Sequence, residues 1–125
     1  MEKKSSKNKA REDRIAFEAI VDAYGPEEQA MGWYYYLEDK MKFPFTATCI
    51  IEREISPLEI GEEVEVIEQA KEDECMREMF VKIRWKRRGL AVPLSQLKPS
   101  ESTDAETTEA VEDWHYWVEQ GHELC

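Results

Sequence analysis

The sequence has few of the residues and none of the motifs that usually mark an enzyme. It contains two histidines and five glycines, and no G-x-S-x-G elbow, Walker loop, H-E-x-x-H helix or dinucleotide-binding glycine pattern. No serine, cysteine or histidine lies in an arrangement that suggests an activated nucleophile. Paired acids alone can support glycoside hydrolysis, but a chain of 125 residues offers no evident substrate cleft. We therefore expect a protein that is not an enzyme.

Cysteines and long apolar runs are also scarce. The three cysteines, Cys49, Cys75 and Cys125, show no C-x-x-C spacing, and His115 and His122 lack the spacing of zinc ligands. No apolar segment is long enough to span a membrane, and none near the start fits a secretory signal. These absences predict a reduced, cytoplasmic protein without structural zinc, in which Cys49 is a small core residue.

Negative charge is what the sequence has in excess. Its 28 acidic residues outnumber its 17 basic residues, which gives a formal net charge of -11 and a pI near 4.7. A surface of this sign repels nucleic acid and anionic membranes. We therefore expect neither of these as a partner of the whole chain, and fixed carboxylates on such a protein favour a hard cation.

The order of patterns along the chain predicts one α+β domain. Residues 1–10 are polar and lysine-rich, as in a disordered basic tail, and the remainder, 11–125, is long enough for one hydrophobic core. The expected elements are a helix pair over 11–42, a β core over 45–97, a linker over 98–108 and a C-terminal helix over 109–121.

Helical periodicity marks the first of these segments. Phe17, Ile20, Val21 and Tyr24 fall at helical spacing, which predicts a first helix from Arg11. The pair Gly25–Pro26 ends this helix and begins the next one. The second helix carries a wider apolar face, formed by Ala30, Trp33, Tyr34, Tyr36, Leu37 and Met41.

Alternation with a period of two replaces helical spacing after Phe45. The segment 46–54, TATCIIERE, predicts a first strand, and 63–68 alternates valine with glutamate in a second. In the third, Val81, Ile83 and Trp85 alternate with basic residues. Pro93 either confines the closing strand to an edge or ends its pairing. Four short antiparallel strands with tight turns predict a small, SH3-like, partly open barrel.

The basic strand admits two interpretations. Lys82, Arg84 and Lys86 around Trp85 resemble the composition of a nucleic-acid-binding sheet. The glutamates of the preceding strand can instead pair with these side chains across the sheet, and this is the interpretation we favour. The glutamates concerned are Glu63, Glu65 and Glu68.

The most informative segment is GWYYYLEDKMKFPF, residues 32–45. A surface helix has no use for so much aromatic area, so we expect the segment to be packed and to hold Glu38 and Asp39 in place beside the Phe43–Phe45 corner. Calcium takes six to eight oxygens from carboxylates, carbonyls and water, and clustered carboxylates repel one another until a divalent ion enters. We therefore predict a main calcium site at Asp39 and Glu38, completed by carbonyls near Phe43.

Other acids could form a second, weaker calcium site. The EF-hand pattern D-x-[DN]-x-[DN]-G-x5-E is absent, so any site must be assembled from separate segments. One ion cannot join both ends of the second helix, because about 1.5 Å per residue places Glu28 about 16 Å from Asp39. Composition leaves open that all these acids are solvated side chains. The candidates for the second site are Asp22, Glu27 and Glu28, or the loop of Glu72, Asp73 and Glu74.

An ordered series of segments resembles one known family. VDAYGPEEQAMGWYYYLEDKMKFPF, GEEVEVIE, FVKIRW, LAVPLSQL and DWHYWVEQG together resemble the cyanobacterial calcium-binding protein family CcbP over residues 14 to about 122. The resemblance implies a compact α/β protein that binds calcium without EF-hands and buffers or regulates intracellular calcium. In filamentous nitrogen-fixing relatives it implies a link to heterocyst differentiation. It also implies that an acid of the segment Leu37–Lys40 is a principal ligand, which we assign first to Asp39 and second to Glu38.

A protein-interaction module is the alternative function. The SH3-like barrel could present its face near Trp85 and Arg88 to a protein partner, with or without calcium. We expect a monomer in either case. The few glycines and the many aromatic residues predict a rigid calcium buffer rather than a sensor that opens when calcium binds.

Overall fold

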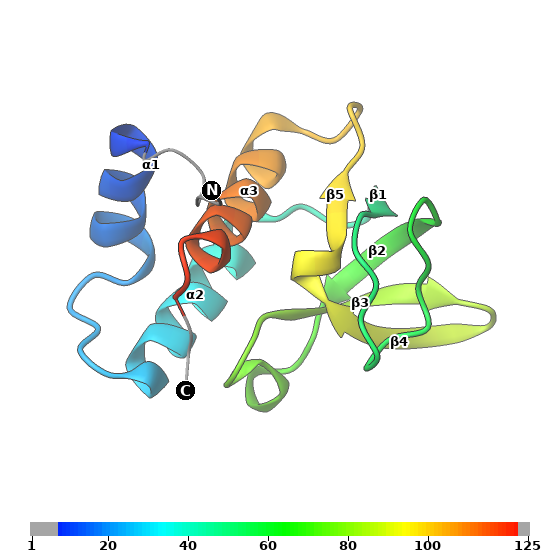
Figure 1. The fold of residues 1–125 in the computed structure, drawn as a ribbon, viewed down its shortest axis with the longest axis horizontal. Helices are drawn as coiled ribbons and strands as arrows, with labels where there is room; N and C mark the ends of the chain where they lie inside the picture. The colour runs from blue at the N-terminus through cyan, green and yellow to red at the C-terminus, as the bar shows by residue number, and fades with distance from the viewer. Residues whose placement is uncertain (1–7, 123–125) are drawn as a thin grey trace, which may run out of the picture.

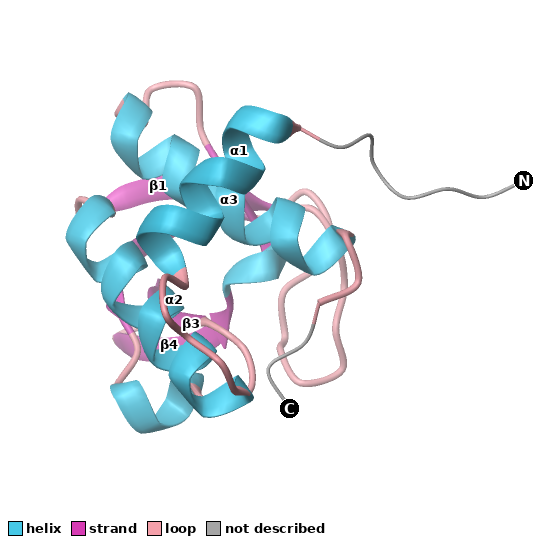
Figure 2. Ribbon diagram, turned by 90° about the vertical axis from the view of Figure 1, so that its left-hand side faces the viewer, coloured by secondary structure: helices cyan, strands magenta, loops and turns pink. Residues whose placement is uncertain are grey.

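The computed structural model describes residues 8–122, in which helices form one layer and a five-stranded antiparallel sheet forms the other (Figure 1). Seen from the helix side, α1, α2 and α3 lie in front of the strands (Figure 2). None of the described helices is long and apolar enough to cross a membrane. The elements in chain order are α1 (Lys9–Arg14), the π-helical turn η1 (Ile15–Ala19), α2 (Pro26–Lys40), β1 (Phe45–Cys49), β2 (Glu63–Gln69), the 3-10 turn η2 (Glu72–Cys75), β3 (Phe80–Trp85), β4 (Arg88–Pro93), the 3-10 turn η3 (Leu94–Gln96), β5 (Leu97–Pro99) and α3 (Ala105–Glu119).

The sheet confirms the α+β class and adds a strand that the sequence did not reveal. Its order is β4-β3-β2-β1-β5, so β4, which ends at Pro93, lies at an edge as expected. The short strand β5 pairs with β1 and places Pro99 opposite Ala47. The segment predicted as a linker over 98–108 was therefore wrong at both ends, since β5 runs to Pro99 and α3 begins at Ala105.

The alternating residues of the strands face the core as predicted. Ala47 lies opposite Val64, and Val81 lies opposite Val92, and all of them are buried. The predicted strand 46–54 was wrong beyond Cys49. After Cys49 the backbone forms hydrogen bonds with Gln96 instead of a strand. The Gln96 carbonyl accepts the Ile50 N–H at 2.7 Å, and the Gln96 side chain donates to the Ile51 carbonyl at 2.9 Å.

The first helix differs most from expectation. Of the four apolar residues at helical spacing, Phe17, Val21 and Tyr24 are 72%, 52% and 86% exposed. The helix changes to a π turn, in which the Ile20 N–H donates to the Ile15 carbonyl at 3.0 Å, and it ends at Ala19, so Val21 and Tyr24 lie beyond it. A π turn has more residues than an α turn, so the side chains that face the core change. The residues of η1 that face the core are Ile15 and Ala19.

The start of this helix also corrects the predicted tail of residues 1–10. Residues 1–7 lie outside the described residues. Asn8 is the N-cap of α1, and its side chain accepts the Arg11 N–H at 3.0 Å. Lys9 and Ala10 are helical. A cap of this kind satisfies one of the unpaired N–H groups of the first turn, so the ordered helix begins earlier than composition suggested.

Gly32 allows α2 to pack closely against η1. A Cβ at this position would lie 2.4 Å from the Ala19 carbonyl oxygen, which no real side chain tolerates. The adjacent aromatic side chains then fill the core, as the sequence predicted. Trp33 meets Trp114 edge-on with ring centroids 5.2 Å apart, and Trp117 lies 5.6 Å from Trp33. Such pairs add to the stabilisation from buried area.

A buried carboxylate joins the helices. Asp113 of α3 is fully buried and accepts two hydrogen bonds from Arg14, at 2.9 and 2.8 Å, and one from the Tyr36 hydroxyl at 2.6 Å. Burial and the bond to Asp113 raise the pKa of Tyr36, while the bond to Asp113 raises the pKa of Arg14. Arg11 Nε lies 3.4 Å from the same carboxylate. The charge of Asp113 is thus compensated from both α1 and α2.

Replacing Asp113 tests this network. We expect Asp113→Asn to lower the free energy of unfolding by about 3 kcal/mol, because it leaves the Arg14 guanidinium without its buried counter-ion. The measurement is urea unfolding followed by circular dichroism. The control is Asp13→Asn, an exposed acid paired with Lys9 at 3.4 Å, which should change stability by no more than about 0.5 kcal/mol. Equal effects of the two variants would contradict the role of Asp113.

Candidate metal site

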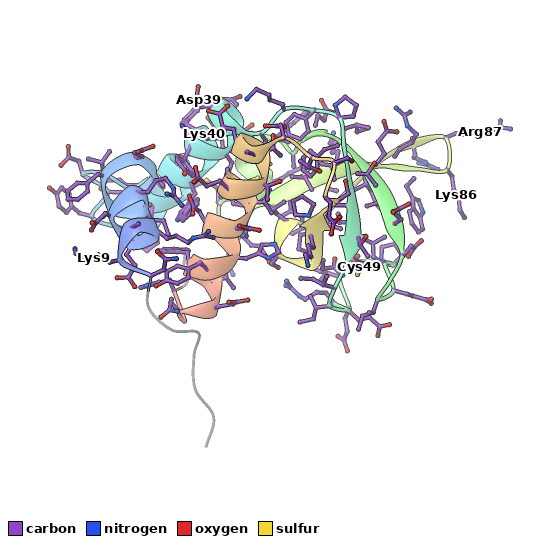
Figure 3. The ribbon with its side chains drawn as sticks, turned by 90° about the horizontal axis from the view of Figure 1, so that it is seen from above. Lys9, Asp39, Lys40, Cys49, Lys86 and Arg87 are labelled. Carbon is purple, nitrogen blue, oxygen red and sulfur yellow. The ribbon has the colours of Figure 1, made fainter. Side chains whose placement is uncertain are left out.

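Glu38 and Asp39 lie in the last turn of α2, and both side chains are exposed. Figure 3 shows Asp39 beside Lys40 at one end of the helix layer. The helix closes when the Met41 N–H donates to the Leu37 carbonyl at 2.8 Å. The final carbonyls of a helix lack intrahelical partners and form the negative end of its dipole, so a cation is favoured at this position.

Lysines separate Asp39 from the acids at the start of α3. Lys42 hydrogen-bonds to Glu106 and lies 3.9 Å from Asp104, and Lys40 lies 3.7 Å from Glu106. The bond to Glu106 is the main cause of the raised pKa of Lys42, to which Asp39 contributes. The acids of α3 therefore already have cationic partners. No pattern in the sequence indicated these ion pairs, because they depend on how α2 and α3 pack.

Asp104 is occupied as a helix cap. Its carboxylate accepts the Thr107 hydroxyl at 2.7 Å and the Thr107 N–H at 3.0 Å, and these bonds lower the pKa of Asp104. Thr107 also accepts the Lys42 N–H at 2.8 Å, which ties the chain after α2 to α3. The corner 43–45 that we predicted as part of the main site lines a cavity of about 390 Å³ together with Ser102, Thr103 and Asp104. The corner thus faces the cap of α3.

The acidic loop, which the sequence had assigned to a separate site, contacts α2 at Tyr35. The Tyr35 hydroxyl donates a hydrogen bond to Glu72 of η2. This bond is the main cause of the raised pKa of Tyr35, and the charges of both Glu72 and Glu38 contribute. Burial is the largest cause of the raised pKa of Tyr34, and the charges of Glu38 and Glu72 raise it further. Glu38 and Glu72 therefore act on the same pair of tyrosines.

The other members of the acidic loop are oriented differently. Asp73 and Glu74 are exposed within η2. Glu74 folds back onto the backbone, where its carboxylate accepts the Lys71 N–H at 3.4 Å. Glu72 is thus the member of this loop that the structure links to α2.

The acids at the start of α2 form a different environment. Glu28 accepts the Tyr24 N–H at 2.8 Å, and Asp22 lies 3.5 Å from the Tyr24 hydroxyl. Glu27 is exposed in the first helical turn. This is the positive end of the helix dipole, which stabilises carboxylates and disfavours a cation. Of the two predicted positions on α2, its C-terminal end therefore suits a metal ion better.

The basic strand pairs across the sheet as we favoured. Arg84 Nε lies 2.8 Å from Glu65 on β2, and Lys82 lies 4.0 Å from Glu68. Lys86 and Arg87 lie in the turn between β3 and β4, and Figure 3 shows them projecting from the end of the sheet that is far from the helices.

No preformed cage for a metal ion is present in residues 8–122. Among these residues, no three His, Cys, Asp or Glu side chains are grouped so that they could hold an ion. An ion at the end of α2 would take two or three carboxylates and complete its shell with backbone carbonyls and water. Calcium accepts such a mixed and flexible oxygen shell, so these residues fit calcium.

Comparison with known proteins agrees with this chemistry. A family model described as "Calcium binding", Calci_bind_CcbP, matches residues 13–118. A crystal structure of CcbP from Anabaena is 36% identical with a TM-score of 0.82, covering 94% of this chain and 96% of that chain. A calcium binding protein in the calcium-binding form is also 36% identical, with a TM-score of 0.80 and coverage of 92% and 94%. The comparison with curated protein sequences gave no match. The resemblance is thus confirmed, and the chain belongs to the CcbP family of calcium-binding proteins.

Proposed function

We propose that this protein binds calcium at the C-terminal end of α2 and buffers or regulates free calcium in the cytoplasm. Asp39 is the principal ligand, Glu38 the second, and Glu72 contributes from the neighbouring loop. The protein acts as a monomer and not as an enzyme. As for the filamentous relatives, its calcium binding is linked to heterocyst differentiation.

The proposal depends on the exposed acids in the last turn of α2 and on the contact between α2 and η2. Two exposed carboxylates of one helical turn, Glu38 and Asp39, lie at the negative end of the helix dipole. Tyr35, one helical turn before Glu38, hydrogen-bonds to Glu72, so the acidic loop packs against the same helix. Each additional negative charge near this turn strengthens its attraction for a divalent cation.

The loop acids Asp73 and Glu74 can bind a second, weaker ion beyond Glu72. Asp22, Glu27 and Glu28 are less suited to that role, because Glu28 is used in a backbone hydrogen bond and the helix dipole opposes a cation.

The first test is calcium titration by calorimetry. We expect Asp39→Asn to weaken calcium binding at least about tenfold, since it removes a charged ligand of the main site. Glu38→Gln should weaken it by a smaller factor. Magnesium should compete poorly, because it requires a tighter octahedral shell than this open turn provides.

The matched control is Glu27→Gln, which removes one exposed carboxylate from the opposite end of the same helix. Its calcium affinity should stay within about twofold of the unmodified protein. An unchanged affinity in Asp39→Asn would remove Asp39 from the site. Binding no tighter than millimolar would refute the buffer. A protein partner that depends on Trp85 and not on calcium would then support the interaction module.

Tyr35 provides a local test of the site. Glu72 and Glu38 raise its pKa because a negative environment disfavours the phenolate. A calcium ion bound to these carboxylates reverses that influence, so calcium should lower the pKa of Tyr35. NMR titration of the tyrosine ring carbons measures this shift, with Tyr24 as the comparison. A Tyr35 pKa that is the same with and without calcium would place the ion elsewhere.

The packing of α2 favours a buffer over a switch. Trp33 and Leu37 of α2 are fully buried, and Tyr36 is bound to Asp113. Rotating or opening this helix would break those contacts. We therefore expect calcium to slow amide hydrogen exchange in the last turn of α2 and in η2, with the rest of the chain unchanged. Wide calcium-dependent opening of the helix layer would instead identify a sensor.

A further inference from the structure

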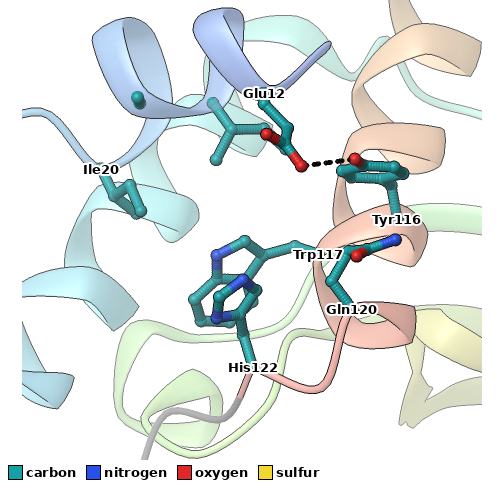
Figure 4. Close-up of a pocket in the computed structure, with 8 residues that line it drawn as sticks. Glu12, Ile20, Tyr116, Trp117, Gln120 and His122 are labelled. Atoms are coloured by element: carbon teal, nitrogen blue, oxygen red, sulfur yellow. Dashed lines mark hydrogen bonds between the residues drawn. The ribbon is translucent and has the colours of Figure 1, made fainter. Parts of the chain in front are cut away.

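The polar groups beside α3 are held by partners within the chain. Figure 4 shows a cavity of about 230 Å³ in which the Tyr116 hydroxyl donates to Glu12 at 2.6 Å and the His122 ring stacks on Trp117. The outer edge of the sheet differs, because within residues 8–122 both backbone groups and cations there lack partners. This edge is strand β4, together with the turn that joins it to β3. Figure 1 shows this hairpin extending from the sheet on the side away from the helices.

Strand β4 presents part of its backbone on the side away from β3. The Leu94 N–H donates to the Met79 carbonyl at 2.9 Å. Bonded and non-bonded pairs alternate along an antiparallel ladder, so every second residue of β4 is bonded to β3. The bonded residues are Arg88, Leu90 and Val92, opposite Trp85, Ile83 and Val81. The N–H and C=O groups of Gly89 and Ala91 therefore point to the open edge.

No other strand covers these groups in the described part of the chain. Strand β4 ends the sheet order, and no hydrogen bond among residues 8–122 joins Gly89 or Ala91 to another segment at this edge. An unpaired edge is where an additional strand can bind, through main-chain hydrogen bonds. Pro93 has no N–H, so such pairing is limited to the end of β4 near the turn.

Gly89 leaves room for a second backbone at this edge. A Cβ added to Gly89 would meet no atom closer than 3.7 Å, so packing within the chain does not require glycine. A glycine inside a strand often marks a place where another backbone approaches closely. Ala91 points to the same face of the sheet, since side chains alternate along a strand. This face of β4 therefore carries little side-chain bulk.

The turn beside this edge carries three cations without acidic partners. Lys86 and Arg87 form the turn, Arg88 begins β4, and all three are exposed. Within residues 8–122 none of them forms an ion pair, whereas the cations of β3 pair with glutamates of β2. Lys86 has a φ of 57°, in the left-handed region that glycine and asparagine adopt most readily. The conformation of the turn therefore does not account for a lysine here.

We propose that β4 and its turn bind an extended acidic segment of another protein, which adds to the sheet as a further strand. The main chain of that segment pairs with Gly89 and Ala91. Its carboxylates lie at Arg87 and Arg88, whose guanidinium groups suit bidentate bonds to carboxylates.

Other occupants fit this edge less well. A nucleic acid cannot continue a β-ladder, and the charge along its whole length is repelled by a protein with a net charge of -11. A second copy of β4 brings another Arg88 instead of a carboxylate. The open backbone and the unpaired cations together select an acidic strand.

The test is NMR titration of the full chain with the peptide acetyl-EEVTVT-amide, with acetyl-QQVTVT-amide as the uncharged peptide of the same size. We expect the acidic peptide to shift the amide resonances of Gly89 and Ala91 saturably and to slow the exchange of these two N–H groups. The glutamine peptide should bind at least about tenfold more weakly, because it lacks the charge-assisted bonds. Equal binding of the two peptides, or no saturable shift at Gly89 and Ala91, would overturn the proposal.

A matched pair of double variants locates the carboxylates. Arg87→Gln combined with Arg88→Gln should weaken binding of the acidic peptide at least about tenfold. The control combines Arg77→Gln with Lys98→Gln, which removes two exposed cations outside this hairpin and should leave the affinity within about twofold. Equal losses in the two proteins would show diffuse attraction between charges and contradict a site at the turn.

A third comparison tests strand addition. Ala91→Pro removes the N–H that points to the open edge and none of those that bond β4 to β3, so it should weaken peptide binding at least about tenfold. If this variant does not fold, the unmodified protein is titrated with the acidic peptide N-methylated at each valine and threonine. That peptide should also bind at least about tenfold more weakly, because it cannot donate main-chain hydrogen bonds. Undiminished binding of the methylated peptide would show a contact of charges alone and overturn strand addition.

Two competing occupants are tested on the same protein. Oligothymidylate that shifts the Gly89 and Ala91 resonances at lower concentration than the acidic peptide would identify a nucleic-acid surface. A dimer in sedimentation velocity that the acidic peptide dissociates would identify a second copy as the strand that binds β4. Either result would overturn the proposal of an acidic protein partner.

Discussion

The arrangement of the helix layer depends on the hydrogen bonds that the buried carboxylate of Asp113 accepts. A buried carboxylate costs several kcal/mol to desolvate unless charged partners compensate it. Arg14 and Tyr36 supply this compensation from two different helices. Because α1 and α2 share this acceptor on α3, neither helix can shift alone without breaking a hydrogen bond to the buried Asp113 carboxylate. The last turn of α2, with Glu38 and Asp39, is held in place by the same constraint.

The many acids of this chain divide into two groups by their partners. Asp113 and Asp104 are engaged by arginine, tyrosine and threonine, and they stabilise the fold. Glu38 and Asp39 are exposed at a helix end that favours positive charge. The net charge attracts cations to the whole surface, but it cannot select a position. In our proposal, the calcium ion binds where the fold leaves carboxylates exposed to water beside backbone carbonyls.

The sequence predicted best where local pattern and packing agree. Alternation identified the buried residues of β2 and β3, and the aromatic segment of α2 is packed as expected. The pattern at Phe17 misled because helical periodicity assumes 3.6 residues per turn and the π turn breaks it, and Tyr24 lies beyond the helix, which ends at Ala19. The contact of Glu72 with Tyr35 of α2 had no local signal, since it arises from packing between a loop and a helix. The cap at Asp104 did have one, in the residues DAETTEA, but the Ser/Thr-rich composition around it suggested a linker.

The basic turn at Lys86 and Arg87 projects from the sheet, away from Asp39 (Figure 3). This turn concentrates positive charge on a protein whose net charge is -11. A negatively charged macromolecule is repelled by the protein as a whole but attracted to this turn. Glu38 and Asp39 belong to α2 and not to the turn, so a contact made through the turn does not involve the proposed calcium ligands.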